Sequence, residues 1–494
     1  MSATTEQISP SSSPPRPAQA AVQAWALDLY GSADMPDKRL NARTVRMAVR
    51  LAEAPTDPLT QSCADFAEVK ASYRLLENQR LVPEHLRRAM RQKGARDARG
   101  RPCILVVQDT TALSFPRSPA TEGLGPITNN TTPGLLVHTA LAVGLEGKPI
   151  GILSQQVWAR PQETSALTPA ERKRLPIEEK ESRKWIDGMA ETRQAIAEAI
   201  PAGPRPRLIH VFDREGDIHE AFADVTEHED GCVIRSTQNR RASDIEGTAV
   251  GEDTLGGAHD LVAASPLLGS IDVAVERKGE RKGRVARVEI RSIALQLRSA
   301  CPYHKRAPLE IQMVEAREVG APAGVKEPIL WRLLSTEACA TFGEARAVVA
   351  IYAHRWLIEE VHLILKSGCR IQDVRLRKAR RIELLLAMYS AVAVFLLQLR
   401  EWSRLEPEAP CTEVLDAETW PVLYAAVHGY AAPPELATPT IRQAVLWIGR
   451  LGGHLGRKGD GMPGIRVLWR GWRDLSRFVA VARSLRVQRR NPSP

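Results

Sequence analysis

The sequence is poor in cysteine and lacks both a secretory leader and an apolar run long enough to cross a membrane. Its seven cysteines among 494 residues lie at least thirty positions apart, which excludes a disulfide framework and a CxxC zinc knuckle. The polar start leads into a Ser/Pro run at Ser9–Pro17, unlike a signal peptide. The longest apolar stretch, Leu384–Leu399, is interrupted by Ser390 and Gln398 and is shorter than the ~20 residues that span a bilayer. We therefore expect a buried helix there, an intracellular protein, and any metal on oxygen or nitrogen ligands.

Positive charge is in excess, and it is unevenly placed. The 68 Lys and Arg against 58 Asp and Glu give a net charge of +10. Counted along the chain, it is about +4 over residues 1–100, +2 over 101–400, −6 over 401–440 and +10 over 441–494. This polarity indicates an anionic partner. With 44% apolar residues the chain can bury sizeable cores, and at ~100–200 residues per domain its length predicts two to four domains.

Composition and periodicity divide the chain into four regions. Residues 1–20 are rich in Ser, Pro and Thr and predict a disordered tail. Residues 21–100 have helical periodicity. Residues 101–402 alternate strands and helices, with a β-rich insertion from about 231 to 341 that shows no strong helix. Residues 403–494 begin with an acidic, Pro-rich stretch and predict two basic helices after it.

Two local basic patterns stand out. Asp37 is a plausible N-cap for a helix that places Arg39, Arg43 and Arg46 along one stripe, because they follow at steps of four and three residues. In the insertion, the turn at 277–284 carries five Lys and Arg. A solvated turn and a contact with phosphate both remain open for that turn.

Two apolar runs predict buried strands, and each is followed by an aspartate. Cys103–Val107 and Leu208–Phe212 are too short and too β-branched for helices. Asp109 and Asp213 stand where these runs end, and in open α/β sheets functional groups gather at strand ends. The alternative for each aspartate is a carboxylate that caps a turn.

The segment Tyr352–Lys366 gathers polar groups on one face of a predicted helix. At ~100° per residue, four polar residues share an arc of about 60°: Tyr352, Arg355, Glu359 and Lys366. Lys and Arg can neutralise phosphate, Tyr can donate to a phosphate oxygen, and Glu can hold a metal ion. The alternative is a solvated face with an intrahelical ion pair. His354 and His362 are not expected to be ligands.

The spacing Y-x2-R-x3-E-x6-K in this segment is similar to the signature of the DDE transposases of insertion-sequence family four. The resemblance is colinear over nearly the whole chain. The other matching segments are Ala71–Arg74, Asp109–Thr111, Glu179–Trp185, Asp213–His219, Val233–Ser236, Trp331–Leu334, Ala444–Gly453 and Leu468–Trp472.

The resemblance implies an α/β fold with an RNase H-like catalytic core, a mixed sheet with flanking helices that a β-rich insertion interrupts. It also implies a helical N-terminal DNA-binding domain and a helical C-terminal dimerisation region. By resemblance, Asp109, Asp213 and Glu359 are the catalytic carboxylates and hold two Mg²⁺ ions, which Mn²⁺ can replace. Two ions ~3.5–4 Å apart need one bridging carboxylate, here assigned to Asp109, and others that hold each ion.

The resemblance also assigns the DNA contacts. It places Trp331 under a flipped base, on which an indole can stack; the alternative is an ordinary core tryptophan. By resemblance, Tyr352, Arg355 and Lys366 contact transposon-end phosphates near the scissile bond. Arg235 is a further expected DNA contact, and the stripe of Arg39, Arg43 and Arg46 in the N-terminal helices is a candidate phosphate contact by its spacing.

The implied function is cut-and-paste transposition by a homodimer acting on double-stranded DNA, namely terminal inverted repeats and target DNA. A metal-bound water nicks one strand, and the freed 3′ hydroxyl then forms a hairpin and later attacks the target. The implied location is the bacterial cytoplasm, at the nucleoid and away from membranes. Two alternatives stay open: a catalytically silent regulator that binds the ends, and an RNase H-like nuclease without strand transfer. The complete set of carboxylates argues against a decayed enzyme.

Overall fold

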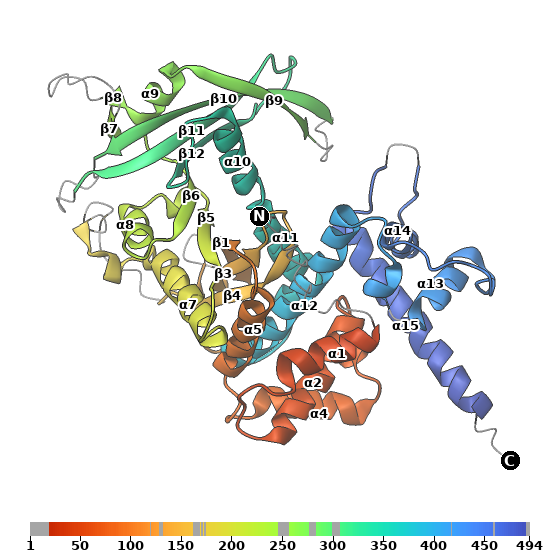
Figure 1. The fold of residues 1–494 in the computed structure, drawn as a ribbon. Coiled ribbons are helices and arrows are strands. Elements are labelled where there is room, and N and C mark those ends of the chain that lie inside the picture. Colours follow the sequence, from red (N-terminus) through yellow and green to blue (C-terminus); the bar gives the residue numbers. More distant parts are fainter. Residues whose placement is uncertain are drawn as a thin grey trace, which may run out of the picture.

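The computed structural model describes residues 19–490 except 119, 128–131, 162–167, 169–170, 172–173, 246–255, 276–282, 299–306, 416 and 458–459. Most of the expected tail and of the basic turn at 277–284 lies outside the described residues. Figure 1 shows a helical N-terminal lobe, a sheet that runs up into the insertion, and a group of C-terminal helices joined to the rest by one long central helix.

The N-terminal region is helical, as its periodicity predicts. Its helices are α1 (Gln19–Tyr30), α2 (Lys38–Glu53), α3 (Leu59–Ser62), α4 (Phe66–Glu77) and α5 (Pro83–Asp97). Asp37 caps α2 as expected, since its Oδ1 accepts the backbone N–H of Leu40 at 2.9 Å. Arg39, Arg43 and Arg46 are all exposed on α2.

The core sheet has the strand order of an RNase H-like fold. Its strands are β1 (Cys103–Ser114), β3 (Pro133–Val143), β4 (Pro149–Trp158), β5 (Arg207–Phe212) and β6 (Gly231–Arg235), with the short β2 (Gly125–Pro126) beside one end of β3. β4, β3 and β1 are successive antiparallel neighbours, and β5 and β6 continue the sheet parallel to β1. Parallel neighbours require helical crossovers, which α7 (Arg183–Ala199) and α8 (His219–Glu227) supply.

Helices cover both faces of this core sheet. Ile104 and Val106 of β1 pack with residues of α5 and α7, whereas Leu105 and Val107 join the large cluster that includes α10 (Phe342–Ala353), α11 (Trp356–Leu363) and α12 (Ala379–Leu405). Because strand side chains alternate, residues 105, 107 and 109 share the face towards α11, and 108 and 110 share the face towards α7.

Helix α12 is long and apolar enough to span a membrane by composition alone, but 89% of its most apolar window is buried inside the protein. In Figure 1 it crosses the middle of the molecule between the core sheet, the N-terminal helices and the C-terminal helices. The predicted buried helix at Leu384–Leu399 is confirmed.

The insertion continues the core sheet. It consists of β7 (Arg241–Asp244), β8 (Gly256–Gly257), α9 (Ala258–Ala264), β9 (Leu267–Val275), β10 (Arg284–Leu297), β11 (Leu309–Val319) and β12 (Leu330–Ser335). β12 pairs antiparallel with β6, so the described strands form one twelve-stranded sheet. β6, expected as the first strand of the insertion, belongs to the core, and α9 is a short helix where none was expected.

Two local predictions are wrong. The strand that begins at Cys103 continues past Asp109 to Ser114, because residues 108–114 keep pairing with β3. The helix expected over Tyr352–Lys366 is interrupted: α10 ends at Ala353, α11 begins at Trp356, and residues 364–368 form a π-helical turn, η4. At the junction, backbone bonds tighten to a three-residue spacing, as in the 3.0 Å bond from Arg355 N–H to the Tyr352 carbonyl.

The C-terminal region contains α13 (Thr419–His428), α14 (Ile441–Leu451) and α15 (Ile465–Arg490). The last two are the expected basic helices. α15 also contacts the N-terminal region: the Trp472 indole donates to the Ala52 carbonyl at 2.9 Å, and Arg477 lies 2.7 Å from the Asp57 carboxylate. Helix α15 therefore packs against the N-terminal helical region.

Candidate active site

The two aspartates lie on neighbouring parallel strands of the core sheet. β1 pairs with β5 as far as Val107, opposite Val211, so Asp109 stands two residues beyond the last pair and Asp213 directly follows β5. Asp109 accepts the backbone N–H of Thr110 at 2.8 Å. Asp213 caps a short turn by accepting the N–H of Glu215 at 2.9 Å. Both carboxylates are thus fixed by local backbone donors.

Both aspartates are held in an environment that disfavours their charge. Burial, followed by the negative charge of Asp213, raises the pKa of Asp109 to about 7, although the Thr110 N–H and the Arg355 guanidinium oppose this rise. Burial also raises the pKa of Asp213, against its hydrogen bond from Glu215. The repulsion between the two carboxylates makes the pair a site where a cation is stabilising.

Glu359 lies in the first turn of α11, and its carboxylate forms an ion pair with Arg355. Among the described residues, no group of three or more His, Cys, Asp and Glu side chains is placed to hold a metal ion. The oxygen donors of Asp109, Asp213 and Glu359 nevertheless fit a hard divalent cation. After burial, the charges of Asp213 and Glu359 contribute to the raised pKa of Asp109, so the three carboxylates act on one another.

Aromatic and cationic side chains border the carboxylates. The Arg355 guanidinium lies 5.8 Å from the centre of the Tyr352 ring, and that ring packs edge-on against Trp331 at 5.1 Å. Tyr352 is buried and Trp331 half-buried. Burial raises the pKa of the Tyr352 phenol, while the Arg355 and Arg235 guanidinium groups lower it. These four side chains therefore form one group.

Two residues that follow Glu359 also approach Asp109. Burial lowers the pKa of Lys366, in η4, and the negative charge of Asp109 opposes that shift. The buried His362 places Nδ1 3.7 Å from Asp109 Oδ2, and burial lowers its pKa to about 3, so the ring is neutral. The sequence analysis does not expect His362 to be a ligand. One feature of the sequence does indicate that it lies near the site: it stands three residues after Glu359, on a neighbouring part of the helix surface.

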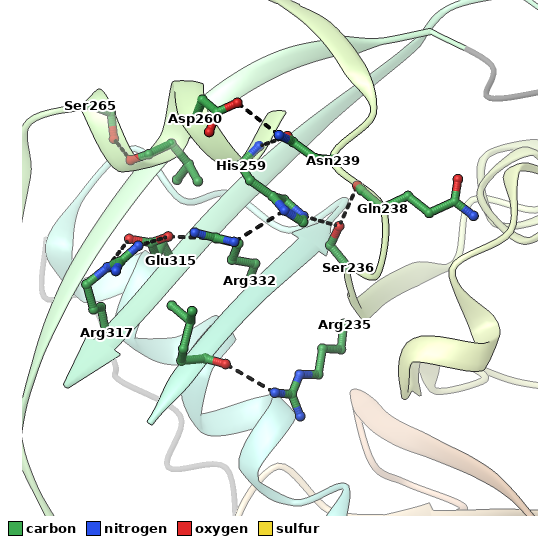
Figure 2. A network of polar contacts seen from close by, with 12 residues as sticks. Arg235, Ser236, Gln238, Asn239, His259, Asp260, Ser265, Glu315, Arg317 and Arg332 are labelled. Carbon is green, nitrogen blue, oxygen red and sulfur yellow. Dashed lines mark hydrogen bonds and ion pairs between the residues drawn. The ribbon is translucent and has the colours of Figure 1, made fainter. Parts of the chain in front are cut away.

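A polar network fixes the strand that carries Arg235 to the strand that carries Trp331, as Figure 2 shows. Arg235 donates to the Leu330 carbonyl at 3.1 Å. Arg332 donates to His259 Nδ1 at 3.3 Å, and His259 Nε2 faces Ser236 Oγ at 2.9 Å. Burial, followed by the charge of Arg332, lowers the pKa of His259. The buried Glu315 holds Arg332 at 2.8 Å, which completes the link between β11, β12 and α9.

The structure thus gathers most of the predicted site residues: Asp109, Asp213, Glu359, Tyr352, Arg355, Lys366, Trp331 and Arg235. The exposed Arg39, Arg43 and Arg46 of α2 lie outside this group, in the N-terminal lobe (Figure 1).

The sheet has this mixed order, with Asp109 just beyond the point where β1 stops pairing with β5, Asp213 directly after β5, and Glu359 on a helix beside them. This arrangement defines an RNase H-like protein of the DDE class. Three family profiles match the chain: "Transposase DNA-binding" at residues 22–81, "Transposase DDE domain" at 170–396 and "Transposase Tn5 dimerisation domain" at 392–490. The chain belongs to the Tn5-like DDE transposases. The DDE match includes Asp213 and Glu359 and begins after Asp109.

Among solved structures, the chain is similar to the piggyBac transposase synaptic complex with hairpin DNA, at 8% identity and a TM-score of 0.29. The match covers 80% of this chain and 57% of that chain, so this chain spans less than two thirds of its length. A likeness this distant supports no inference about assembly or substrate.

Proposed function

We propose that the protein is a cut-and-paste transposase that binds the terminal inverted repeats of its own element, cleaves the ends through a hairpin and joins the 3′ ends to target DNA. Besides the family, one observation carries the proposal: Asp109 and Asp213 repel each other next to the cationic Arg355 and Lys366. A carboxylate pair bordered by cations suits a metal ion and a phosphate together.

Asp109, Asp213 and Glu359 would hold two Mg²⁺ ions, or Mn²⁺ in their place. When bound, such ions activate the attacking oxygen and stabilise the leaving one. The strands of the sheet hold the two aspartates next to each other, and α11 brings Glu359 to the same face. Their elevated pKa favours cation binding, because a bound cation relieves the repulsion that the folded chain imposes.

Arg355 is the residue that links DNA binding to the carboxylates. In the free chain, the Glu359 carboxylate holds the Arg355 guanidinium. A phosphate oxygen is negatively charged like that carboxylate, so it can compete with Glu359 for Arg355. Transfer of Arg355 to an end phosphate releases Glu359 towards Asp109 and Asp213. Tyr352, Lys366 and Arg235 are proposed as further phosphate contacts, and the half-buried Trp331 as a stacking surface for an extruded base.

The same proposal divides the chain by task. Residues 21–100 grip the end DNA, with the exposed Arg39, Arg43 and Arg46 on its phosphates, and residues 101–402 carry out cleavage and joining. Residues 403–494 pair two copies of the chain. The protein acts in the bacterial cytoplasm, on nucleoid DNA.

The test is cleavage of a labelled duplex that carries the element's inverted repeat, taken from the DNA beside the coding region. We expect Mg²⁺-dependent cleavage by the wild-type protein and a loss of at least a thousandfold in Asp109→Ala and Glu359→Ala, because each removes a proposed metal ligand. Asp272→Ala, an exposed aspartate of β9, is the matched control and should cut like wild type. Equal cleavage by all four proteins would contradict the proposal.

In the free chain Glu359 is paired with Arg355 and not with the two aspartates. This pairing favours one alternative function, a regulator that binds transposon ends without cutting them. End binding without any Mg²⁺- or Mn²⁺-dependent cleavage would support that rival. Cleavage without joined products in a plasmid integration assay would instead indicate a nuclease that lacks strand transfer.

A further inference from the structure

A buried histidine lies directly behind the first aspartate, on the opposite face of the sheet. His138 stands opposite Thr110 in the pairing of β3 with β1 and is fully buried. Its Nδ1 lies 2.9 Å from Thr110 Oγ1, and its Nε2 lies 2.9 Å from Gln108 Oε1. One ring therefore contacts both chain neighbours of Asp109.

This part of β1 has support on one side. From Leu105 to Val107 the strand is paired with both β3 and β5, but residues 108–114 are paired with β3 and not with β5. Asp109 is thus presented by a segment that is free on the side of Asp213. His138 adds side-chain bonds to the backbone pairing on the β3 side, at the two residues that flank the carboxylate.

The surroundings of His138 fix the orientation of its ring. The ring packs edge-on against Trp185 of α7, at 4.6 Å between centres. Burial lowers the pKa of His138 well below its usual value, so the ring is neutral and offers one donor and one acceptor. Gln108 is fully buried and fills space left by Gly188, where an added Cβ would lie 2.4 Å from Gln108 Oε1. The His138 ring and its partner Gln108 are therefore both confined by α7.

We propose that His138 is a positioning residue for Asp109: by bridging Gln108 and Thr110 it sets the path of β1 where the strand leaves β5, and so places the carboxylate for divalent-cation binding. This inference rests on the proposed function for the role of Asp109. His138 itself reaches no DNA, metal or reacting group, because it lies on the face towards α7.

The test uses His138→Phe, which keeps a ring against Trp185 and removes both polar contacts. Three quantities are compared with wild type: end-DNA binding in EDTA, the Mn²⁺ concentration that gives half of the maximal rise in Tm without DNA, and the single-turnover rate of end cleavage. Loss of a residue that orients a metal ligand costs about 10–100-fold in metal affinity or activity. We expect that loss in the Mn²⁺ midpoint and in the cleavage rate, with end binding unchanged.

Two further variants separate positioning from general stability. His138→Gln keeps a donor and an acceptor and should recover part of the loss. His210→Phe is the matched control: His210 is buried on the same face of the adjacent strand β5, but its Nε2 faces Asp230 at 3.2 Å, away from Asp109. It should lower Tm in EDTA while leaving the Mn²⁺ midpoint as in wild type.

A partner mutation tests whether His138 acts through Thr110. Thr110→Val removes one of the two bridged groups at nearly constant shape. If the bridge positions Asp109, His138→Phe has a smaller effect in the Thr110→Val background than in wild type, because half of the bridge is already lost. Full additivity of the two substitutions would contradict the bridge.

The inference is overturned if His138→Phe lowers only the Tm in EDTA and leaves the Mn²⁺ midpoint unchanged. Failure of the proposed function gives a different result, namely wild-type protein that binds Mn²⁺ but does not cut its ends. In that case the Mn²⁺ midpoint of His138→Phe still decides whether His138 positions Asp109.

Discussion

Asp109 carries an energetic cost in the free protein. Its pKa is raised to about 7, so between about pH 4 and pH 7 the folded chain binds a proton that the unfolded chain has released. Stability therefore falls as pH rises through this window and stays reduced above it. The charged Asp109 carboxylate therefore lowers the stability of the folded protein. Residues that lower stability in this way are typical of active sites.

Asp109→Asn should accordingly stabilise the protein in EDTA at pH 8 and abolish end cleavage. The amide keeps an acceptor for the Thr110 N–H but has no charge to bury. We expect a gain of about 1–3 kcal/mol in unfolding free energy at pH 8 that shrinks towards zero by about pH 3, where the wild-type carboxyl is protonated in both states. Urea denaturation at the two pH values measures it.

The exposed Asp272→Asn is the control for this gain and should change stability equally at both pH values. Added Mn²⁺ should raise the Tm of wild type and not that of Asp109→Asn. A variant that is less stable than wild type at pH 8 would contradict the charge argument.

At the scale of residues, sequence reasoning found the carboxylates and missed what holds them. Asp109 and Asp213 stand beside apolar runs, and Arg355 and Glu359 are four residues apart, so local patterns made these residues candidates, and the family resemblance assigned their roles. His138 is 29 positions from Asp109 and becomes its neighbour only through the pairing of β3 with β1. Contacts that depend on strand register leave no local pattern in the sequence.

At the scale of elements, a buried ion pair joins the turn after β5 to the loop after β6. Asp217 and Arg240 are both buried and paired. Asp217 also accepts the backbone N–H of Thr237 at 2.8 Å, and Thr237 Oγ1 donates to the Arg214 carbonyl at 2.9 Å. The turn that begins at Asp213 is therefore held by the loop that follows β6.

Asp217→Ala should lower the unfolding free energy by about 3–5 kcal/mol, because it leaves the Arg240 guanidinium buried without a counter-charge. Replacing both partners, as in Asp217→Ala with Arg240→Met, should cost less than the single change. Urea midpoints of the two variants measure the difference. An equal loss in both would show that the pair is not what holds the turn.

Helices and strands could be predicted from the sequence where an apolar pattern runs through the whole element. They could not be predicted where polar residues continue a strand or where a helix changes its geometry. The buried helix α12 follows from its long, mostly apolar stretch, in which Ser390 and Gln398 are the polar interruptions. The second half of β1 reads Gln108-Asp109-Thr110-Thr111, with no apolar run, and it is a strand because β3 pairs with it. The break between α10 and α11 has no Pro or Gly to announce it, so a regular helix was the natural expectation.

At the scale of the whole molecule, α15 has two different faces. Trp472, Leu475 and Val479 are buried against the rest of the chain, and Trp472 bonds to Ala52 of the N-terminal region. On another side of the helix, a stripe at spacings of three and four residues is exposed, with 46–59% of each residue open to solvent: Phe478, Val481 and Leu485. An apolar stripe of this kind within a matched dimerisation domain is the expected contact with a second copy of the chain.

Val481→Asp and Leu485→Asp should therefore each weaken self-association at least tenfold, since burying such a side chain contributes about 1.5–3 kcal/mol and 1.4 kcal/mol is tenfold. Sedimentation equilibrium measures the dissociation constant, and a gel-shift assay should show that single-end binding persists while the paired-end complex is lost. Ser484→Asp adds the same charge beside the stripe and should leave association unchanged. If Val481→Asp associates as wild type does, the two chains contact each other through another surface. The role of α15 is then limited to its contacts with the N-terminal region of its own chain.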